Sequence, residues 1–77
     1  MSLYFLHVAN DRGIVIDEAG RDFDGDELAI AEASRAAGAI LADELQSGAE
    51  GVSLKIYVEH ADKRRVATVS VSGSLTF

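Results

Sequence analysis

The side chains in this sequence best suited to acid-base chemistry are a histidine near the start and a later run of carboxylates. His7 lies among aromatic and branched residues, where an imidazole can serve as an acid, a base or a pH-dependent switch. No Ser, Cys or carboxylate stands at a spacing that would place it beside His7. The sequence therefore gives His7 a structural or interface role, and it predicts no catalytic residue.

The carboxylates offer the hard oxygen ligands that calcium prefers. They are Asp17, Glu18, Asp22, Asp24, Asp26 and Glu27. A calcium loop that begins at Asp22 needs glycine at position 27 and glutamate at position 33, and the chain has Glu27 and Ala33 there. Acidic residues also favour the first turn of a helix, at the positive end of its dipole. We predict no metal site and no cofactor.

The length of 77 residues leaves room for one hydrophobic core, so the chain is predicted to be a single domain over residues 1–77. A core of this size gives little stability and commonly needs support from disulfides, metals or self-association. The sequence has no Cys and only two His, which excludes disulfides and the familiar zinc spacings. Self-association is the remaining common support.

The net charge of -6 is unevenly distributed, because residues 17–50 hold ten acidic and two basic side chains. This balance disfavours direct binding to nucleic acid, which requires a basic surface. The N-terminal residues lack the charged start of a signal peptide, and no stretch is long and apolar enough to span a membrane. The expected setting is the cytoplasm.

The chain contains two predicted hairpins. Residues 3–9 and 14–16 are rich in β-forming residues and flank a turn at 10–13, which Gly13 closes in a left-handed conformation. Residues 54–59 and 66–71 alternate apolar with polar side chains, as half-buried strands do.

One helix is predicted between the hairpins, at about 25–47. Asp24 and Glu27 have the spacing of a capping box, Phe23 and Leu28 that of a hydrophobic staple, and Gly48 suits a left-handed stop. Gly38 is unfavourable inside a helix, so we expect another element to approach it closely. The predicted fold is α+β with the order ββαββ: a four-stranded antiparallel sheet with one helix packed on one face.

The first strand predicts a surface that the helix leaves uncovered. Tyr4, Leu6 and Val8 share one face, whereas other apolar residues lie on the reverse face. The residues expected there are Phe5, His7, Val15 and Tyr57. We expect this face to be an interface between two copies of the chain, although isolated exposed apolar residues are also normal on monomers.

The order of motifs resembles a family of small bacterial ββαββ proteins of unknown function whose first strand reads Tyr-Phe-x-His-Val. The residues that carry the resemblance are Tyr4-Phe5-Leu6-His7-Val8, Asn10-Asp11-Arg12-Gly13, Asp17-Glu18-Ala19-Gly20, Ile56-Tyr57-Val58-Glu59 and Val66-Ala67-Thr68-Val69. This chain has Lys63 where that family usually has a turn glycine. The resemblance implies the fold and a cytoplasmic setting, and it transfers no catalytic residue.

Three functions are compatible with these observations. The first is a non-enzymatic, homodimeric protein-interaction or regulatory module that binds through a sheet face or edge. The second is an antitoxin-like protein that neutralises a basic partner through the acidic segment 17–50. This alternative also draws on a weaker similarity to small antitoxins with a partial ribonuclease-H-like fold. The third is a small ligand-binding protein or enzyme whose site forms between two subunits.

Overall fold

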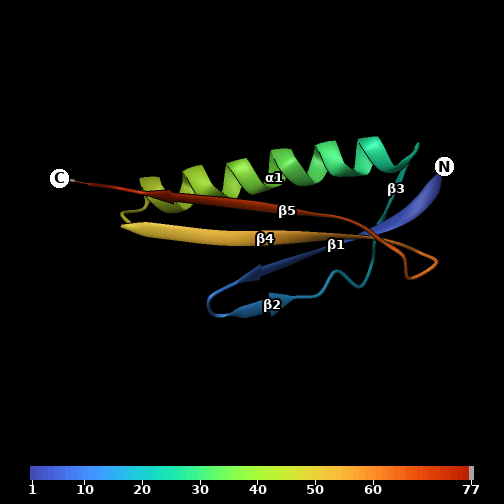
Figure 1. The fold of residues 1–77 in the computed structure, drawn as a ribbon, viewed down its shortest axis with the longest axis horizontal. Coiled ribbons are helices and arrows are strands. Elements are labelled where there is room, and N and C mark those ends of the chain that lie inside the picture. The colour runs from blue at the N-terminus through green and yellow to red at the C-terminus, as the bar shows by residue number, and fades with distance from the viewer. Residues whose placement is uncertain (77) are drawn as a thin grey trace.

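One helix and five strands make up the fold in the computed structural model, which describes residues 1–76 (Figure 1). The elements are β1 (Ser2–Asn10), β2 (Gly13–Val15), β3 (Arg21–Phe23), α1 (Asp26–Gln46), β4 (Gly51–His60) and β5 (Arg65–Ser74). The helix packs against an antiparallel sheet, which confirms the α+β fold. The sheet has one short strand, β3, more than the four predicted.

The strand order is β2-β1-β4-β5, with both predicted hairpins present. The central pair, β1 and β4, runs from Tyr4 opposite His60 to Asn10 opposite Leu54. Tyr4 also pairs with Arg21 of β3, and Val8 also pairs with Val15 of β2. Both short strands therefore lie along the edge of β1 that faces away from β4, and β5 forms the other end of the sheet.

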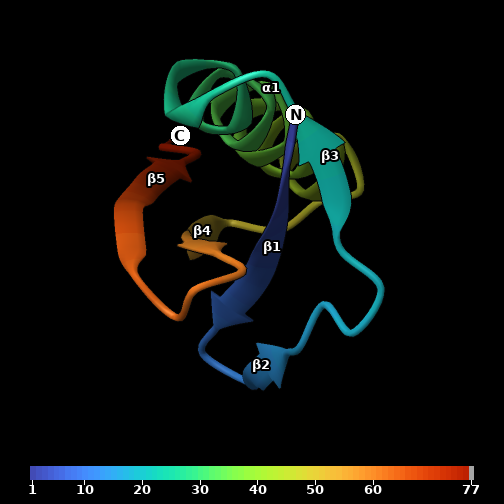
Figure 2. The same ribbon diagram turned by 90° about the vertical axis from the view of Figure 1, so that its right-hand side faces the viewer.

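The core lies between α1 and the middle of the sheet (Figure 2). Ala29, Ala33 and Ala37 recur every fourth residue along one side of the helix and are fully buried. Their small side chains let the helix approach closely above the inward row of β4, which consists of Leu54, Ile56 and Val58. The helix α1 falls within the predicted range of about 25–47.

The start of the helix differs from the prediction. The cap position is Gly25, with a φ of 112°, and no side chain caps the helix, so the predicted capping box at Asp24 is wrong. Phe23 belongs to β3 and packs edge-on against Tyr4, whereas Leu28 stays 54% exposed. The predicted stop is confirmed, because Gly48 has a φ of 99° directly after the last turn.

The additional strand β3 is held to the helix by ion pairs. Glu32 of α1 lies 3.1 Å from Arg21 of β3 and 2.8 Å from Arg35 in the next helical turn. The hydrogen bonds from Arg35, and then those from Arg21, lower the pKa of the Glu32 carboxyl to about 2. Residues 21–23 escaped prediction because three residues are too few to show a strand alternation.

The strand register places three of the four expected interface residues on one face of the sheet and the fourth on the other face. Antiparallel partners share a face, so His7 and Tyr57 lie together on the side of the sheet opposite the helix, and Phe5 lies there opposite Glu59. Val15 is the partner of Val8 and lies on the helix side of the sheet, so its predicted placement is wrong. The two-residue turn of the first hairpin sets this register, and a one-residue difference in loop length reverses the side.

Gly38 does not lie at a close approach. A methyl group built there meets nothing within 4 Å, and the residue is exposed. The expectation is therefore wrong, because the side of α1 that faces the sheet carries the three buried alanines, and Gly38 lies outside that seam.

The turn between β4 and β5 contains a strained residue, Lys63, with a φ of 76°. Left-handed backbone costs a side chain about 1 to 2 kcal/mol, whereas glycine adopts it freely but loses more entropy on folding. We expect Lys63→Gly to raise the free energy of unfolding by about 0.5 to 1 kcal/mol in urea titrations. Lys63→Ala removes the same charge and keeps the strain, so equal gains in both variants would contradict this explanation.

Candidate functional site

Within residues 1–76, the most exposed run of consecutive apolar side chains is Ile14-Val15-Ile16, at the β2 edge of the sheet. These side chains are 52%, 71% and 53% exposed, and they are consecutive. The outer side of β2 pairs with no other described strand. Contiguous apolar surface of this kind commonly marks an interaction site. We call Ile14-Val15-Ile16 the β2 apolar segment.

The face of the sheet opposite the helix, which we call the open face, is only partly open. Phe5, His7 and Tyr57 are half-buried there. The Phe5 and His7 rings are parallel, with centroids 6.3 Å apart, and the Arg65 guanidinium lies 4.5 Å from the centroid of the Tyr57 ring. The chain therefore supplies part of the cover that we expected a partner to provide.

His7 has two polar partners that the sequence did not indicate. Its Nδ1 accepts a hydrogen bond from the backbone N–H of Asp17 at 3.0 Å. This leaves the proton of the neutral ring on Nε2, which lies 3.6 Å from Glu59 Oε1. Glu59 reaches His7 through the pairing of β1 with β4, which joins residues some fifty positions apart and so leaves no spacing signal. The His7 side chain is 14% exposed.

Asp17 organises the loop between β2 and β3. Its carboxylate accepts hydrogen bonds from the backbone N–H groups of Leu6 at 3.0 Å, Ala19 at 3.2 Å and Gly20 at 2.9 Å. Burial alone would raise the pKa of the Asp17 carboxyl, but the three N–H groups outweigh it and hold the pKa below its ordinary value. Asp17 therefore fastens the loop to β1.

Gly20, at the end of the loop that precedes β3, also packs closely against β1. Its φ is 74°, and a Cβ built there lies 2.9 Å from a Leu3 methyl, 3.0 Å from the Phe5 ring and 3.0 Å from the Tyr4 carbonyl oxygen. Only glycine meets both requirements. The Asp17-Glu18-Ala19-Gly20 motif is thus a loop that fits closely against β1, and it holds the β2 apolar segment in place.

Removal of the Asp17 charge has an expected pH signature. Asp17→Asn should lower the free energy of unfolding by about 1 to 2 kcal/mol at pH 7, because a carboxylate that accepts three N–H groups is lost. Since the folded-state pKa is lowered, the contribution of Asp17 is fully present above about pH 4 and is lost as the pH falls through that lowered pKa.

Urea titrations of both proteins from pH 7 to pH 2 measure this effect. Asp24→Asn is the matched control, because the exposed Asp24 makes no side-chain hydrogen bond or ion pair within residues 1–76. A difference between Asp17→Asn and the wild type that stays constant over this range would contradict the assignment.

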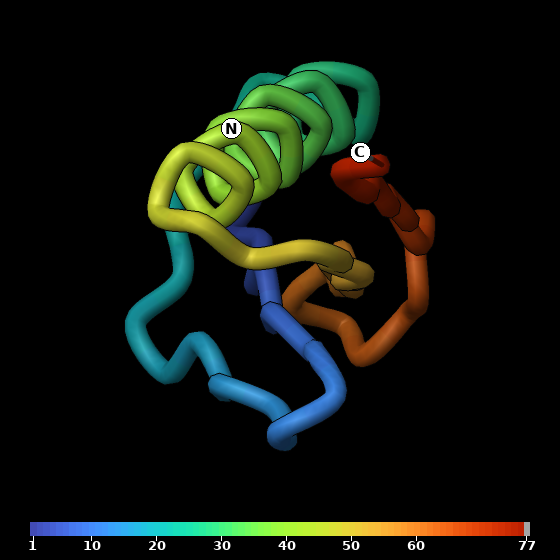
Figure 3. The backbone as a smooth tube through the Cα atoms, turned by 90° about the vertical axis from the view of Figure 1, so that its left-hand side faces the viewer, coloured from blue at the N-terminus to red at the C-terminus, as the bar shows by residue number. Residues whose placement is uncertain are grey.

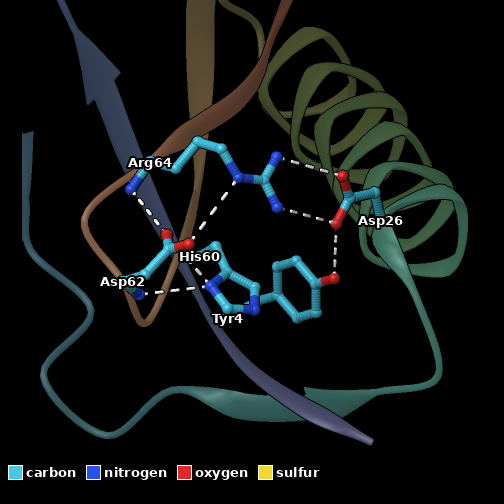
Figure 4. Close-up of polar contacts among 5 residues, drawn as sticks. All are labelled: Tyr4, Asp26, His60, Asp62 and Arg64. Carbon is cyan, nitrogen blue, oxygen red and sulfur yellow. Dashed lines mark hydrogen bonds and ion pairs between the residues drawn. The ribbon is translucent and has the colours of Figure 1, made fainter.

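A polar cluster joins the helix start to the β4–β5 turn (Figure 4). The Tyr4 hydroxyl donates to Asp26 Oδ1 at 2.5 Å, and the Arg64 guanidinium lies 3.2 Å from Asp26 Oδ2. Asp62 accepts the backbone N–H of Arg64 at 2.9 Å, and the ring edge of His60 lies against Tyr4, with centroids 5.1 Å apart. One cluster thus ties together β1, α1 and the second hairpin.

The chemistry of this cluster is structural. The hydrogen bond to Asp26 raises the pKa of the Tyr4 phenol and, with the contribution of Arg64, lowers the pKa of the Asp26 carboxyl. A phenol with a raised pKa is a poor base and a poor nucleophile at neutral pH. His60 Nδ1 lies 3.1 Å from the Asp62 N–H and 3.0 Å from Asp62 Oδ1, so it has a partner in either protonation state.

A groove of about 420 Å³ lies between the end of α1 and the first hairpin turn. Its apolar lining includes Val8, Ile40, Val52 and Leu54, and charged residues such as Arg12 also line it. Within residues 1–76, no three acidic or histidine side chains come together as a metal site would require. The described part of the chain also has no helix long and apolar enough to cross a membrane.

These features define a class of protein: a small α+β domain with one helix on an antiparallel sheet and an apolar sheet edge. The chain belongs to the family DUF6894, a domain of unknown function, whose family model matches residues 3–72. The search of curated proteins gave no match, and neither did the search of solved structures.

Proposed function

We propose that this protein is a non-enzymatic, homodimeric protein-interaction module whose two copies meet at the β2 apolar segment. The observation that carries this proposal is the exposure of three consecutive β-branched side chains at an unpaired sheet edge. A two-fold axis beside β2 brings the segment of one copy against the same segment of the other. Both copies then remove apolar surface from water at once.

The shape of the chain also supports a partner. It measures 46 × 21 × 17 Å, and its radius of gyration is 13.3 Å, against about 11.5 Å for a compact chain of this length. An elongated small domain buries less of its apolar surface than a sphere of the same mass. A contact along the sheet edge compensates for the thin core.

The expected interface residues enter this proposal in two groups. Val15 stands at the centre of the contact, because it is the most exposed member of the β2 apolar segment. Ile14 pairs with Ala9 and lies on the open face, beside the row that holds Phe5 and His7. We place Phe5, His7 and Tyr57 at the margin of the interface, where the half-buried open face continues from that row.

The antitoxin-like alternative receives less support from the contacts. Three carboxylates of the acidic segment 17–50 are engaged within the chain: Asp17 by backbone N–H groups, Asp26 by Arg64 and Glu32 by two arginines. These pairs reduce the charge that is available to a basic partner. The groove gives the ligand-binding alternative a location, and native mass spectrometry of protein from its native cells tests it through the mass of a retained molecule.

Sedimentation equilibrium tests the proposed dimer. We expect the wild-type chain to fit a monomer–dimer equilibrium at micromolar concentration. A monomer throughout, at concentrations up to the millimolar range, would contradict the proposal.

A further inference from the structure

The far end of the sheet from β2 is formed by β5, and it is a second free edge (Figure 2; Figure 3). β5 pairs with β4 on one side, and within residues 1–76 no strand pairs with its outer side. At ten residues it is much longer than β2. A strand edge of this length presents a row of unpaired N–H and C=O groups.

Beyond a register shift at its start, which leaves Val66 without a partner on β4, β5 has little of the usual protection against strand pairing. From Val66 to Ser74 there is no proline and no charged residue. Natural edge strands are usually blunted by lysine, proline, a bulge or a cover. The helix packs along β5, and its C-terminal end closes on the last part of the strand, where Leu45 and Leu41 lie 3.2 and 3.3 Å from the position of a Cβ on Gly73. The regular part of the outer edge, from Ala67 to Ser72, pairs with no strand within residues 1–76.

The core is incompletely covered along this edge. Val71 pairs with Leu54, and Val69 pairs with Ile56, so each pair faces the same helix. The members on β4 are buried, whereas both members on β5 are only half-buried. The difference arises because no strand lies beyond β5 within residues 1–76.

We propose that the free edge of β5 binds an extended segment of another protein, which adds to the sheet as an antiparallel strand. If β2 is the dimer contact, the segment that binds β5 cannot belong to a second copy of this chain. The choice of occupant therefore rests on the proposed function. A sheet that self-pairs at both ends exposes a new free end with every added copy and does not close. A segment of a different protein ends the sheet instead.

The chemistry of β5 defines the segment. Every second side chain of the bound segment is apolar and continues the inward row of Val69 and Val71. The side chains between them are small and polar, and they lie beside Thr68 and Ser70 on the other face. The β4–β5 turn and the start of β5 carry Lys63 and Arg65, whereas Arg64 between them already pairs with Asp26 and Asp62. In an antiparallel arrangement the C-terminal end of the segment lies beside Lys63 and Arg65 and carries acidic side chains.

Amide hydrogen exchange of the full chain tests this inference. The probe is a synthetic peptide of about ten residues in which valine alternates with serine and which ends in two aspartates. We expect amides of alternate residues between Ala67 and Ser72 to exchange fast in the free protein, and to slow by about tenfold or more with saturating peptide. A peptide methylated at alternate backbone nitrogens should produce no slowing, and one ending in two lysines should bind several-fold more weakly.

The outcomes that contradict the inference are distinct from those that contradict the β2 dimer. If the peptide slows no β5 amide, or the methylated peptide acts equally well, the inference is wrong even where the protein dimerises through β2. If the alternate β5 amides are already slow in the free dimer, β5 is the dimer contact, and both proposals are wrong. Val15→Asp should bind the peptide as the wild type does, since β2 and β5 lie at opposite ends of the sheet.

Discussion

Gly20→Ala is expected to lower the free energy of unfolding by about 3 kcal/mol, a large part of the stability of a domain this small. The positive φ of Gly20 accounts for about 1 to 2 kcal/mol of this loss, because a side chain there is strained. The remainder comes from overpacking, since the new methyl group lies 3.0 Å or less from Leu3, Phe5 and the Tyr4 carbonyl oxygen. Urea titration at pH 7 measures the change.

Gly38→Ala is the matched control for this prediction. The same methyl group is added, but nothing lies within 4 Å of it, and Gly38 has helical backbone. We expect it to raise the free energy of unfolding by about 1 kcal/mol, the helix-propensity difference between the two residues. Similar effects at both positions would contradict the proposed fit of the Asp17–Gly20 loop against β1.

Val15→Asp is expected to raise the dissociation constant of the dimer about a hundredfold and to leave the monomer folded. In a two-fold contact both new carboxylates enter the interface, where neither has a partner and each repels the other. Val15 is 71% exposed in the single chain, so the substitution removes little from the core. Sedimentation equilibrium gives the dissociation constant, and circular dichroism reports whether the fold persists.

Leu28→Asp controls for the general effect of an exposed carboxylate. Leu28 is 54% exposed and lies in the first turn of α1, where a negative charge is favourable. It should leave the dissociation constant unchanged. If both variants raise the dissociation constant equally, the contact is not specific to β2 and the proposal is wrong.

The parts of the fold that follow from local patterns were predictable. The two hairpins and the helix each have a period or a turn signal within a few neighbouring residues, and the structure contains all three. Strand β3 was missed because Arg21-Asp22-Phe23 is too short for a period and becomes a strand only through its pairing with β1. The Asp24 cap was predicted from spacing alone, whereas the cap position is taken by Gly25, whose positive φ favours glycine over a residue with a side chain.

The candidate site was less predictable, because its contacts join distant segments. The partnership of His7 with Glu59 depends on the order of strands in the sheet, which no local pattern defines. Asp17 was grouped with residues that favour a helix start, although its carboxylate serves the backbone of β1. The side occupied by Val15 was the exception, since the register of a two-residue hairpin turn determines it.

The central claim is that two copies meet at the β2 apolar segment, and nuclear Overhauser effects between differently labelled copies test it most directly. A mixed sample in which only half of the chains carry labelled isoleucine and valine methyl groups separates contacts between copies from contacts within one. We predict effects between copies among the methyl groups of Ile14, Val15 and Ile16. If the labelled chains form a dimer and these methyl groups show no effect across copies, the two copies meet elsewhere and the claim is wrong.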